Sequence, residues 1–480
     1  MPTVMVEISL VLLPLVSSFL SILLKAYSLI VVQSIVFLLF FCSVLLVINR
    51  AKNIRSIDKL ASLLMVIGFV IWYSFPAFYN CIILNLPAGV LVHGPLDLAI
   101  TICGIFYLSL FLFSWVLASH FFEIVRFFHP MALKQSYESN PLRLLIIAII
   151  GCLIGIMPIV FSGLNFSEII FLIFQGRTVD KPWVRWENLG DIRSPYLFLA
   201  QSAMAAGACL LWILTRENKF SFQTRVLTGC LALTISLVLF FDQGTRSILA
   251  LVFVPMVLMM VFEKPRTSNA IFLFGAIGFM VVFLIVMQFP LIFRTFGTMD
   301  SITSMQNLLS LNLISMGEIS DMFSETIYSL TIVPAFHDYF RESVLFQFLV
   351  SPIPRFLWSS KPLSQVVWFY SLQRDGIDIY QGSGNVFPGI VGQYYMSWGG
   401  WGPILIGGVM GWLSSRIDGF LDRMRRYEDS YLRSIGMMMS VWIALSYRIL
   451  SPGFLYPIII AFLMVLLSRQ SRYKNNIETA

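Results

Sequence analysis

The sequence predicts an all-α, polytopic membrane protein, and three observations support this fold class. Hydrophobic residues make up 58% of the 480 residues, and charged residues only 12%, against about 25% in soluble domains. Mean hydropathy is +0.84. About a dozen apolar stretches have the length of a bilayer span and carry almost no charge. We therefore expect a single membrane domain, residues 1–480, with its chemistry at one membrane face.

A hydropathy window of about 19 residues places spans along the whole chain. The first begins at Val6, with no basic region before it and no small-residue cleavage site after it. We therefore expect a retained span and not a signal peptide. The expected spans are 6–24, 28–48, 60–79, 96–117, 144–162, 196–214, 226–241, 246–262, 270–290, 387–414, 432–449 and 453–468.

Short basic segments between these spans set the orientation. When about twelve spans cross the membrane in turn, all of these basic segments fall on the same side. Basic segments are retained in the cytoplasm, so both termini are expected there. The same positive-inside bias explains the net charge of +7, and nucleic-acid binding is not predicted. The basic segments are 50–59, 126–143, 216–225, 264–266, 416–433 and 469–474.

Two longer hydrophilic segments, 163–195 and 291–386, fall on the outer side. The second has the pattern of short amphipathic helices and lacks the composition of a disordered linker. A segment of this length in a compact membrane protein is usually functional, with a lid or an assembly surface as the alternative.

The six cysteines predict neither a disulfide framework nor a metal site. They lie mostly in apolar runs, without CxxC spacing or a histidine at ligand spacing. Walker and dinucleotide-binding glycine patterns are also absent from the sequence. No cofactor is therefore expected.

The segment FDQGTRS, Phe241 to Ser247, joins two predicted spans through a tight turn. Asp242 and Arg246 are therefore expected at the outer edge of the bundle. An arginine held there can bind a phosphate through two parallel hydrogen bonds, with Asp242 as its resting partner. The alternative is an Asp–Arg pair that only closes the turn.

A second motif, SPIPRFLWSSKP at 351–362, lies in the larger outer segment. Its three prolines restrict the backbone and place Arg355 and Lys361 on either side of Trp358. Two cations and an indole suit a diphosphate beside a sugar or a polyprenyl chain. They equally suit a surface segment with a tryptophan anchor and cations that face lipid headgroups.

The third motif is glycine-rich and runs from Gly382 to Leu413. We expect most of its glycines to permit close helix packing, namely Gly400, Gly407, Gly408 and Gly411. An aromatic cluster at its outer end is able to stack on sugar rings, or to form an ordinary interfacial belt. This cluster contains Gln393, Tyr394, Tyr395, Trp398 and Trp401.

The order of these motifs resembles that of the bacterial Wzy-type O-antigen polymerases. The resemblance rests on Gly-Thr-Arg between two central spans, IPRxLWxxKP in the long outer segment, then Gly-x-x-Tyr and Trp-Gly-Gly-Trp-Gly. The motifs that resemble the family lie between Phe241 and Leu413, and the arrangement of the spans resembles it along the whole chain. It implies a GT-C-like, membrane-embedded glycosyltransferase of the bacterial inner membrane.

The resemblance also implies the reaction and the partners. The substrates would be oligosaccharide repeat units on undecaprenyl diphosphate, joined at the periplasmic face without a nucleotide sugar or a metal. The other partners would be membrane lipids and a chain-length-regulating co-polymerase.

Cations near the leaving diphosphate would stabilise its developing charge. Arg246 and Arg355 are the first candidates, followed by Lys361, Arg294 and Arg448. A base for the acceptor hydroxyl would come from the second outer segment, whose candidates are His337, Asp338, Glu342 and Glu325. Late proton loss without a dedicated base remains the alternative.

Two other functions fit the same membrane class. An O-antigen ligase would share the donor but transfer the finished chain to lipid A core. A lipid-linked oligosaccharide flippase or other transporter would have a similar number of spans, with its site near the midplane and between repeated halves. The basic and glycine patterns show no such repeat, and the unusual cations lie at the outer face.

Overall fold

The computed structural model describes an almost wholly helical chain. Seven described helices are long and apolar enough to cross a membrane, which confirms a helical multi-pass membrane protein. These candidate spans are Val4–Leu23, Leu29–Ala51, Leu60–Ile83, Leu98–Ile124, Pro141–Val160, Phe222–Leu239 and Trp401–Arg426. The described residues are 2–53, 59–86, 96–128, 138–174, 193–243, 246–263, 321–341, 350, 358, 365–376, 387–427, 429–448 and 452–470.

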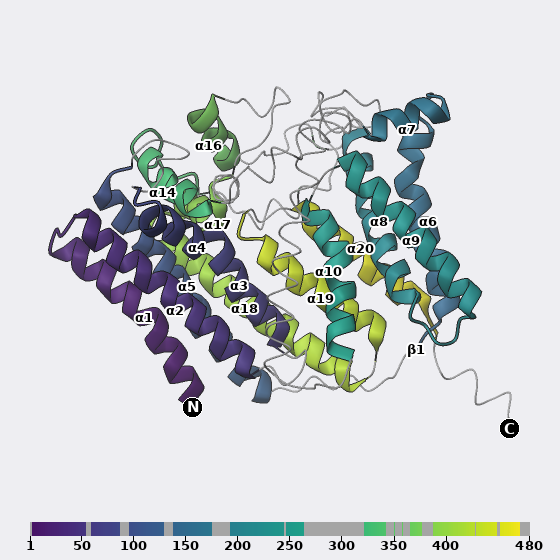
Figure 1. The fold of residues 1–480 in the computed structure, drawn as a ribbon, viewed down its shortest axis with the longest axis horizontal. Coiled ribbons are helices and arrows are strands. Elements are labelled where there is room, and N and C mark those ends of the chain that lie inside the picture. Colours follow the sequence, from purple (N-terminus) through teal and green to yellow (C-terminus); the bar gives the residue numbers. More distant parts are fainter. Residues whose placement is uncertain are drawn as a thin grey trace.

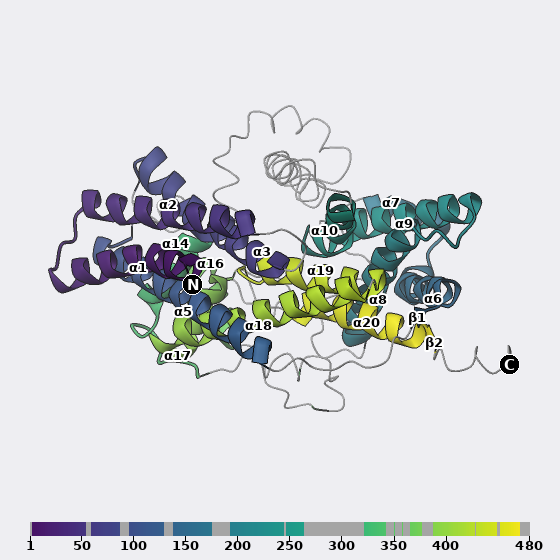
Figure 2. The same cartoon turned by 90° about the horizontal axis from the view of Figure 1, so that it is seen from below.

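The helices form two groups, which Figures 1 and 2 show side by side. The first group contains α1 (Pro2–Leu23), α2 (Leu29–Asn53), α3 (Leu60–Phe69) with its continuation, α5 (Leu98–Phe128) and α18 (Trp401–Arg426). The second contains α6 (Pro141–Val160), α7 (Phe166–Phe174), α8 (Arg193–Leu214), α9 (Phe222–Gln243), α10 (Arg246–Glu263) and α20 (Pro452–Ser468). Helix α19 (Ser430–Leu445) joins the groups, because it contacts both α3 and α10.

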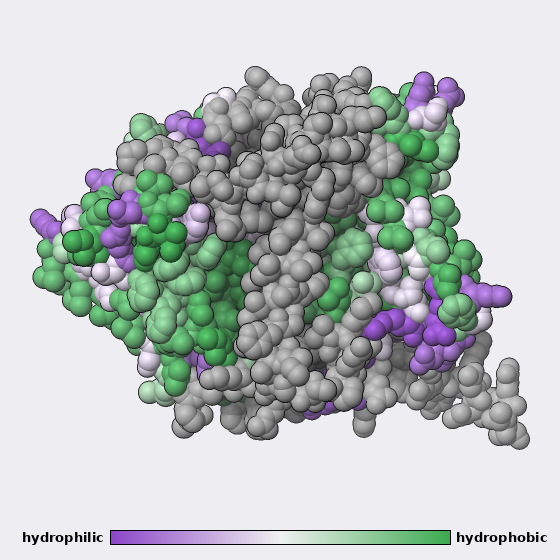
Figure 3. Space-filling view, in the orientation of Figure 1, coloured by the Kyte–Doolittle hydropathy of each residue, from purple (hydrophilic) through white to green (hydrophobic). Residues whose placement is uncertain are grey.

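The side chain of the residue directly before the helix caps both α6 and α19. Asn140 accepts hydrogen bonds from the first amides of α6, and Asp429 caps α19 in the same way. Helix α3 continues through the π-helical segments η2 (Val70–Ser74) and η3 (Tyr79–Ile83), with α4 (Phe75–Phe78) between them. Figure 3 shows apolar surface over much of the described flanks, as expected for helices that face lipid.

The chain's last described residues return to the start of α6. The strand β1 (Glu138–Ser139) pairs antiparallel with β2 (Arg469–Gln470), and the Asn140 amide donates to the Ser468 carbonyl at 3.1 Å. Helix α20 also packs against both α6 and α8.

Glycines allow α18 to lie directly against α5. A Cβ atom at Gly407 would lie 2.4 Å from the Phe111 carbonyl oxygen, and one at Gly411 would lie 2.6 Å from that of Trp115. The predicted packing role is therefore confirmed at these two positions. It is wrong at Gly408, where a Cβ atom would meet nothing within 4 Å, because this position faces away from α5.

The predicted span 387–414 is wrong in its boundaries. Helix α17 (Gly389–Trp398) ends at Gly399, whose φ of +59° breaks the helix, and α18 begins at Trp401. The candidate span is therefore Trp401–Arg426. The predicted span 270–290 lies outside the described residues, whereas the other ten coincide with described helices.

We predict that Gly407→Ala destabilises the protein by about 1–3 kcal/mol, because the added methyl group overpacks the α5–α18 contact. The matched control is Gly408→Ala on the same helix, which should be neutral or stabilise by up to about 1 kcal/mol. Thermal unfolding of the purified variants measures both. Equal midpoints for the two variants would contradict the packing assignment.

Candidate functional site

A small cap covers the end of the first helix group opposite the N-terminus (Figure 1). We define the cap as α14 (Met322–Ile332), residues 333–341, α16 (Gln365–Asp375) and α17. It has its own apolar core, which consists of Ile332, Val333, Val366, Phe369, Tyr370 and Met396. Parts of the larger predicted outer segment therefore fold onto α17 instead of extending away from the bundle.

A buried ion pair joins two helices of the cap. Glu325 Oε1 on α14 lies 2.7 Å from Arg374 Nη2 on α16, and the two side chains are 4% and 16% exposed. The Tyr370 hydroxyl donates to Glu325 Oε2 as well. Burial, together with the Glu325 carboxylate, raises the pKa of Tyr370 well above its usual range. Tyr370 therefore stays a hydrogen-bond donor to Glu325.

His337 lies on the exposed surface of the same cap. Its ring stacks on Phe340, with ring centroids 4.1 Å apart, and also contacts Phe369. Its Nδ1 donates to the Asp338 carbonyl oxygen at 2.5 Å, because a carbonyl can only accept. The neutral imidazole then keeps the lone pair on Nε2, the state that a general base requires. Asp338 contributes its backbone to this arrangement.

Tyrosines attach the cap to α5. The Tyr395 ring lies 5.1 Å from that of Tyr107 on α5 and 6.0 Å from that of Tyr339, between centroids. Tyr394 and Tyr395 are each 7% exposed, and burial raises the pKa of both hydroxyls. Trp398 is 41% exposed and Trp401 is 72% exposed, so the two tryptophans of the aromatic cluster present far more surface than its tyrosines.

Arg448 lies beside the cap, just beyond α19. The Tyr447 carbonyl oxygen before it accepts hydrogen bonds from the Ile390 amide, at 2.9 Å, and from the Tyr73 hydroxyl, at 3.1 Å. These contacts fix the Tyr447 backbone between α17 and η2. The Arg448 guanidinium lies over the Phe387 ring, with Cζ 5.8 Å from its centroid.

The structure thus brings His337, Asp338, Tyr394, Tyr395, Trp398 and Arg448 to one end of the helix bundle. Arg246 is the first residue of α10, and its side chain is outside the described part. The other predicted residues, Arg294, Glu342, Arg355 and Lys361, also lie outside the described residues.

Arg374 and Tyr370 are not among the site residues predicted from the sequence. The only local signal is an arginine at the end of a mostly apolar helix, and this pattern is common. Within the described ranges, no three His, Cys, Asp or Glu side chains gather as a metal site would require. No family model, curated protein or solved structure matches the chain.

We expect the Glu325–Arg374 pair to stabilise the cap. Glu325→Ala should lower stability by about 3 kcal/mol, because it removes one partner of a buried ion pair. Tyr370→Phe should cost about 1 kcal/mol, the value of one hydrogen bond. Thermal unfolding tests both, with Tyr27→Phe, at a tyrosine 38% exposed, as the control. Unchanged midpoints for both cap variants would contradict this role.

Proposed function

We propose that this chain is an O-antigen or surface-polysaccharide polymerase. It would join oligosaccharide repeat units carried on undecaprenyl diphosphate, at the periplasmic face of the bacterial inner membrane. The observation that carries the proposal is the cap: an exposed histidine with an available Nε2 packs on Phe369 of the apolar core, and Tyr370 of the same core donates to the buried Glu325–Arg374 pair. The ordered motifs between Phe241 and Leu413 support the same reaction.

The position of the cap supports chemistry at a membrane surface. The ends of α2 and α18 lie at the same end of the molecule as the N-terminus, opposite the cap (Figure 1). We call this the basic end, because it carries Arg50, Lys59, Arg423, Arg425 and Arg426. The positive-inside rule favours the cytoplasm for the basic end and hence the periplasm for the cap.

The proposed reaction transfers a glycan between two lipid carriers. The acceptor sugar hydroxyl attacks the anomeric carbon of the donor glycan, and the bond from that carbon to the diphosphate oxygen breaks. His337 Nε2 takes the hydroxyl proton, and undecaprenyl diphosphate leaves with the electron pair. Arg448, Arg246 and Arg355 are the proposed cations for the negative charge that develops on the diphosphate.

An O-antigen ligase remains the second candidate, because it would use the same donor and a similar exposed histidine. A flippase is disfavoured, since its polar site is expected near the midplane between repeated halves, whereas the cap lies at one end of the helices. A chain-length-regulating partner would follow from the polymerase assignment.

The lipopolysaccharide banding pattern of a bacterial strain that lacks this chain tests the function. We expect a band of lipid A core with a single repeat, which complementation converts into a ladder. Bare core would indicate a ligase or a flippase, and an unchanged ladder would contradict the proposal. In the same strain, His337→Ala should leave the single-repeat band. Phe336→Ala, at an exposed neighbour, should restore the ladder.

Arg246→Ala and Arg355→Ala test the proposed contacts with the diphosphate. Each should reduce polymer formation about 10- to 100-fold without loss of expression, because a charge-assisted hydrogen bond contributes about 1.5–3 kcal/mol. Arg246→Lys and Arg355→Lys are the controls, because lysine keeps the positive charge but cannot form the two parallel hydrogen bonds of a guanidinium. Full-length polymer from both alanine variants would exclude the diphosphate contacts while leaving the polymerase assignment intact.

A further inference from the structure

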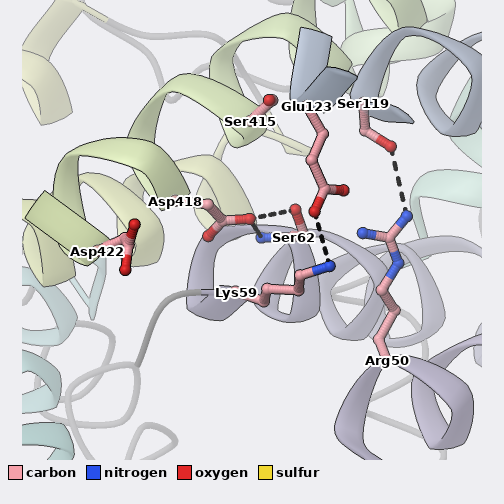
Figure 4. A pocket seen from close by; sticks show the side chains of 8 residues that line it. All are labelled: Arg50, Lys59, Ser62, Ser119, Glu123, Ser415, Asp418 and Asp422. Carbon is pink, nitrogen blue, oxygen red and sulfur yellow. Dashed lines mark hydrogen bonds and ion pairs between the residues drawn. The ribbon is translucent and has the colours of Figure 1, made fainter. Parts of the chain in front are cut away.

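A polar cavity lies at the basic end, far from the cap. It has a volume of about 240 Å³ and lies among the ends of α2, α3, α5 and α18 (Figure 4). Since one water molecule occupies about 30 Å³ of liquid, this cavity has room for a hydrated ligand. Its walls combine carboxylates, cations and serine hydroxyls, which is unusual within membrane-spanning helices.

Most of the charges around the cavity are paired. Lys59 Nζ lies 2.9 Å from Glu123 Oε1, and Arg50 Nη2 lies 2.5 Å from Glu7 Oε2. Asp422 also lines the cavity, and its carboxylate pairs with the guanidinium of Arg426, one turn further along α18. These carboxylates therefore have cationic partners.

Asp418 is the exception. It lies on α18, is 5% exposed, and forms no ion pair among the described residues, although Arg50, whose guanidinium pairs with Glu7, is close enough for its charge to act on Asp418. Its carboxylate accepts hydrogen bonds from the Ala61 amide at 2.8 Å and the Ser62 amide at 3.3 Å, and from the Ser62 hydroxyl. These donors orient the carboxylate but leave a full negative charge inside a membrane helix, which is costly.

Ser415 supplies an independent observation. It precedes Asp418 by almost one turn of α18, lines the same cavity and is 6% exposed. Within the described part of the chain, its hydroxyl has no hydrogen-bond partner. Because the residue lines the cavity, the hydroxyl oxygen is available to a ligand there.

We propose that this cavity binds one small monovalent cation. Asp418 would supply the compensating negative charge, and the hydroxyl oxygens of Ser415 and Ser62 would supply neutral ligands. The one positive charge of a monovalent cation matches the one carboxylate of the cavity that forms no ion pair, Asp418. A divalent metal is a poorer match, because the described residues contain no suitable group of three His, Cys, Asp or Glu.

The bound cation would connect two helices. Asp418 already holds the first amides of α3, so a cation on its carboxylate would fix the start of α3 against α18. Binding would therefore stabilise the folded basic end, and stability would depend on cation concentration by mass action. The cap lies at the other end, so this inference does not depend on the proposed polymerase activity.

The test is thermal unfolding of the purified full-length chain in NaCl, in KCl and in N-methyl-D-glucamine chloride at equal ionic strength. We expect a saturable rise of the midpoint by about 2–8 °C in at least one of the two metal salts. Equal midpoints in all three salts would overturn the proposal. A midpoint that depends on pH alone would also overturn it, because a proton would then compensate Asp418.

Matched variants locate the effect. Asp418→Asn should abolish the cation-dependent rise, whereas Asp422→Asn, one turn later and already paired, should retain it. Ser415→Ala should raise the half-saturating cation concentration at least about threefold without disturbing the amides held by Asp418. Ser415→Ala also answers the question if Asp418→Asn does not fold. Wild-type cation dependence in both Asp418→Asn and Ser415→Ala would place any bound cation elsewhere.

Discussion

The contact between α5 and α18 is the constraint on which both ends of the first helix group depend. Because Gly407 and Gly411 have no side chains, the backbone of α18 reaches the carbonyl oxygens of Phe111 and Trp115. In a bilayer, close packing of this kind replaces the hydrophobic effect as the force between helices. Helix α18 starts beside the cap and carries Asp418 near its other end, so one interface fixes the position of two polar regions.

The sequence predicts the helices well, because a bilayer requires long apolar segments and leaves few alternatives. Ten of the twelve expected spans coincide with described helices. The error at 387–414 has a local cause, since a hydropathy window averages over the break at Gly399 and joins α17 to α18. Gly408 shows the limit of a glycine pattern, which does not say which face of a helix meets its neighbour.

The site is less predictable than the fold. His337 and Arg448 stand out as ionisable residues where few occur, and the structure places His337 in the cap and Arg448 beside it. Arg374 becomes notable only through Glu325, which is distant in sequence, and a hydropathy pattern contains no information about that pairing. Asp418 is similar, because it differs from the neighbouring carboxylates only through their partners: Glu7 and Glu123 pair with cations of other segments, and Asp422 pairs with Arg426 one turn along α18.

The pairing between β1 and β2 has a consequence for how the protein is made. The ribosome releases α6 and α8 long before α20, yet α20 packs on both, and the strand after it pairs with the residues that precede α6. The second helix group therefore remains open on one side until α20 has been made. During that interval lipid or a membrane chaperone must cover the exposed faces of α6 and α8, so insertion of α20 is the step that closes this side of the group.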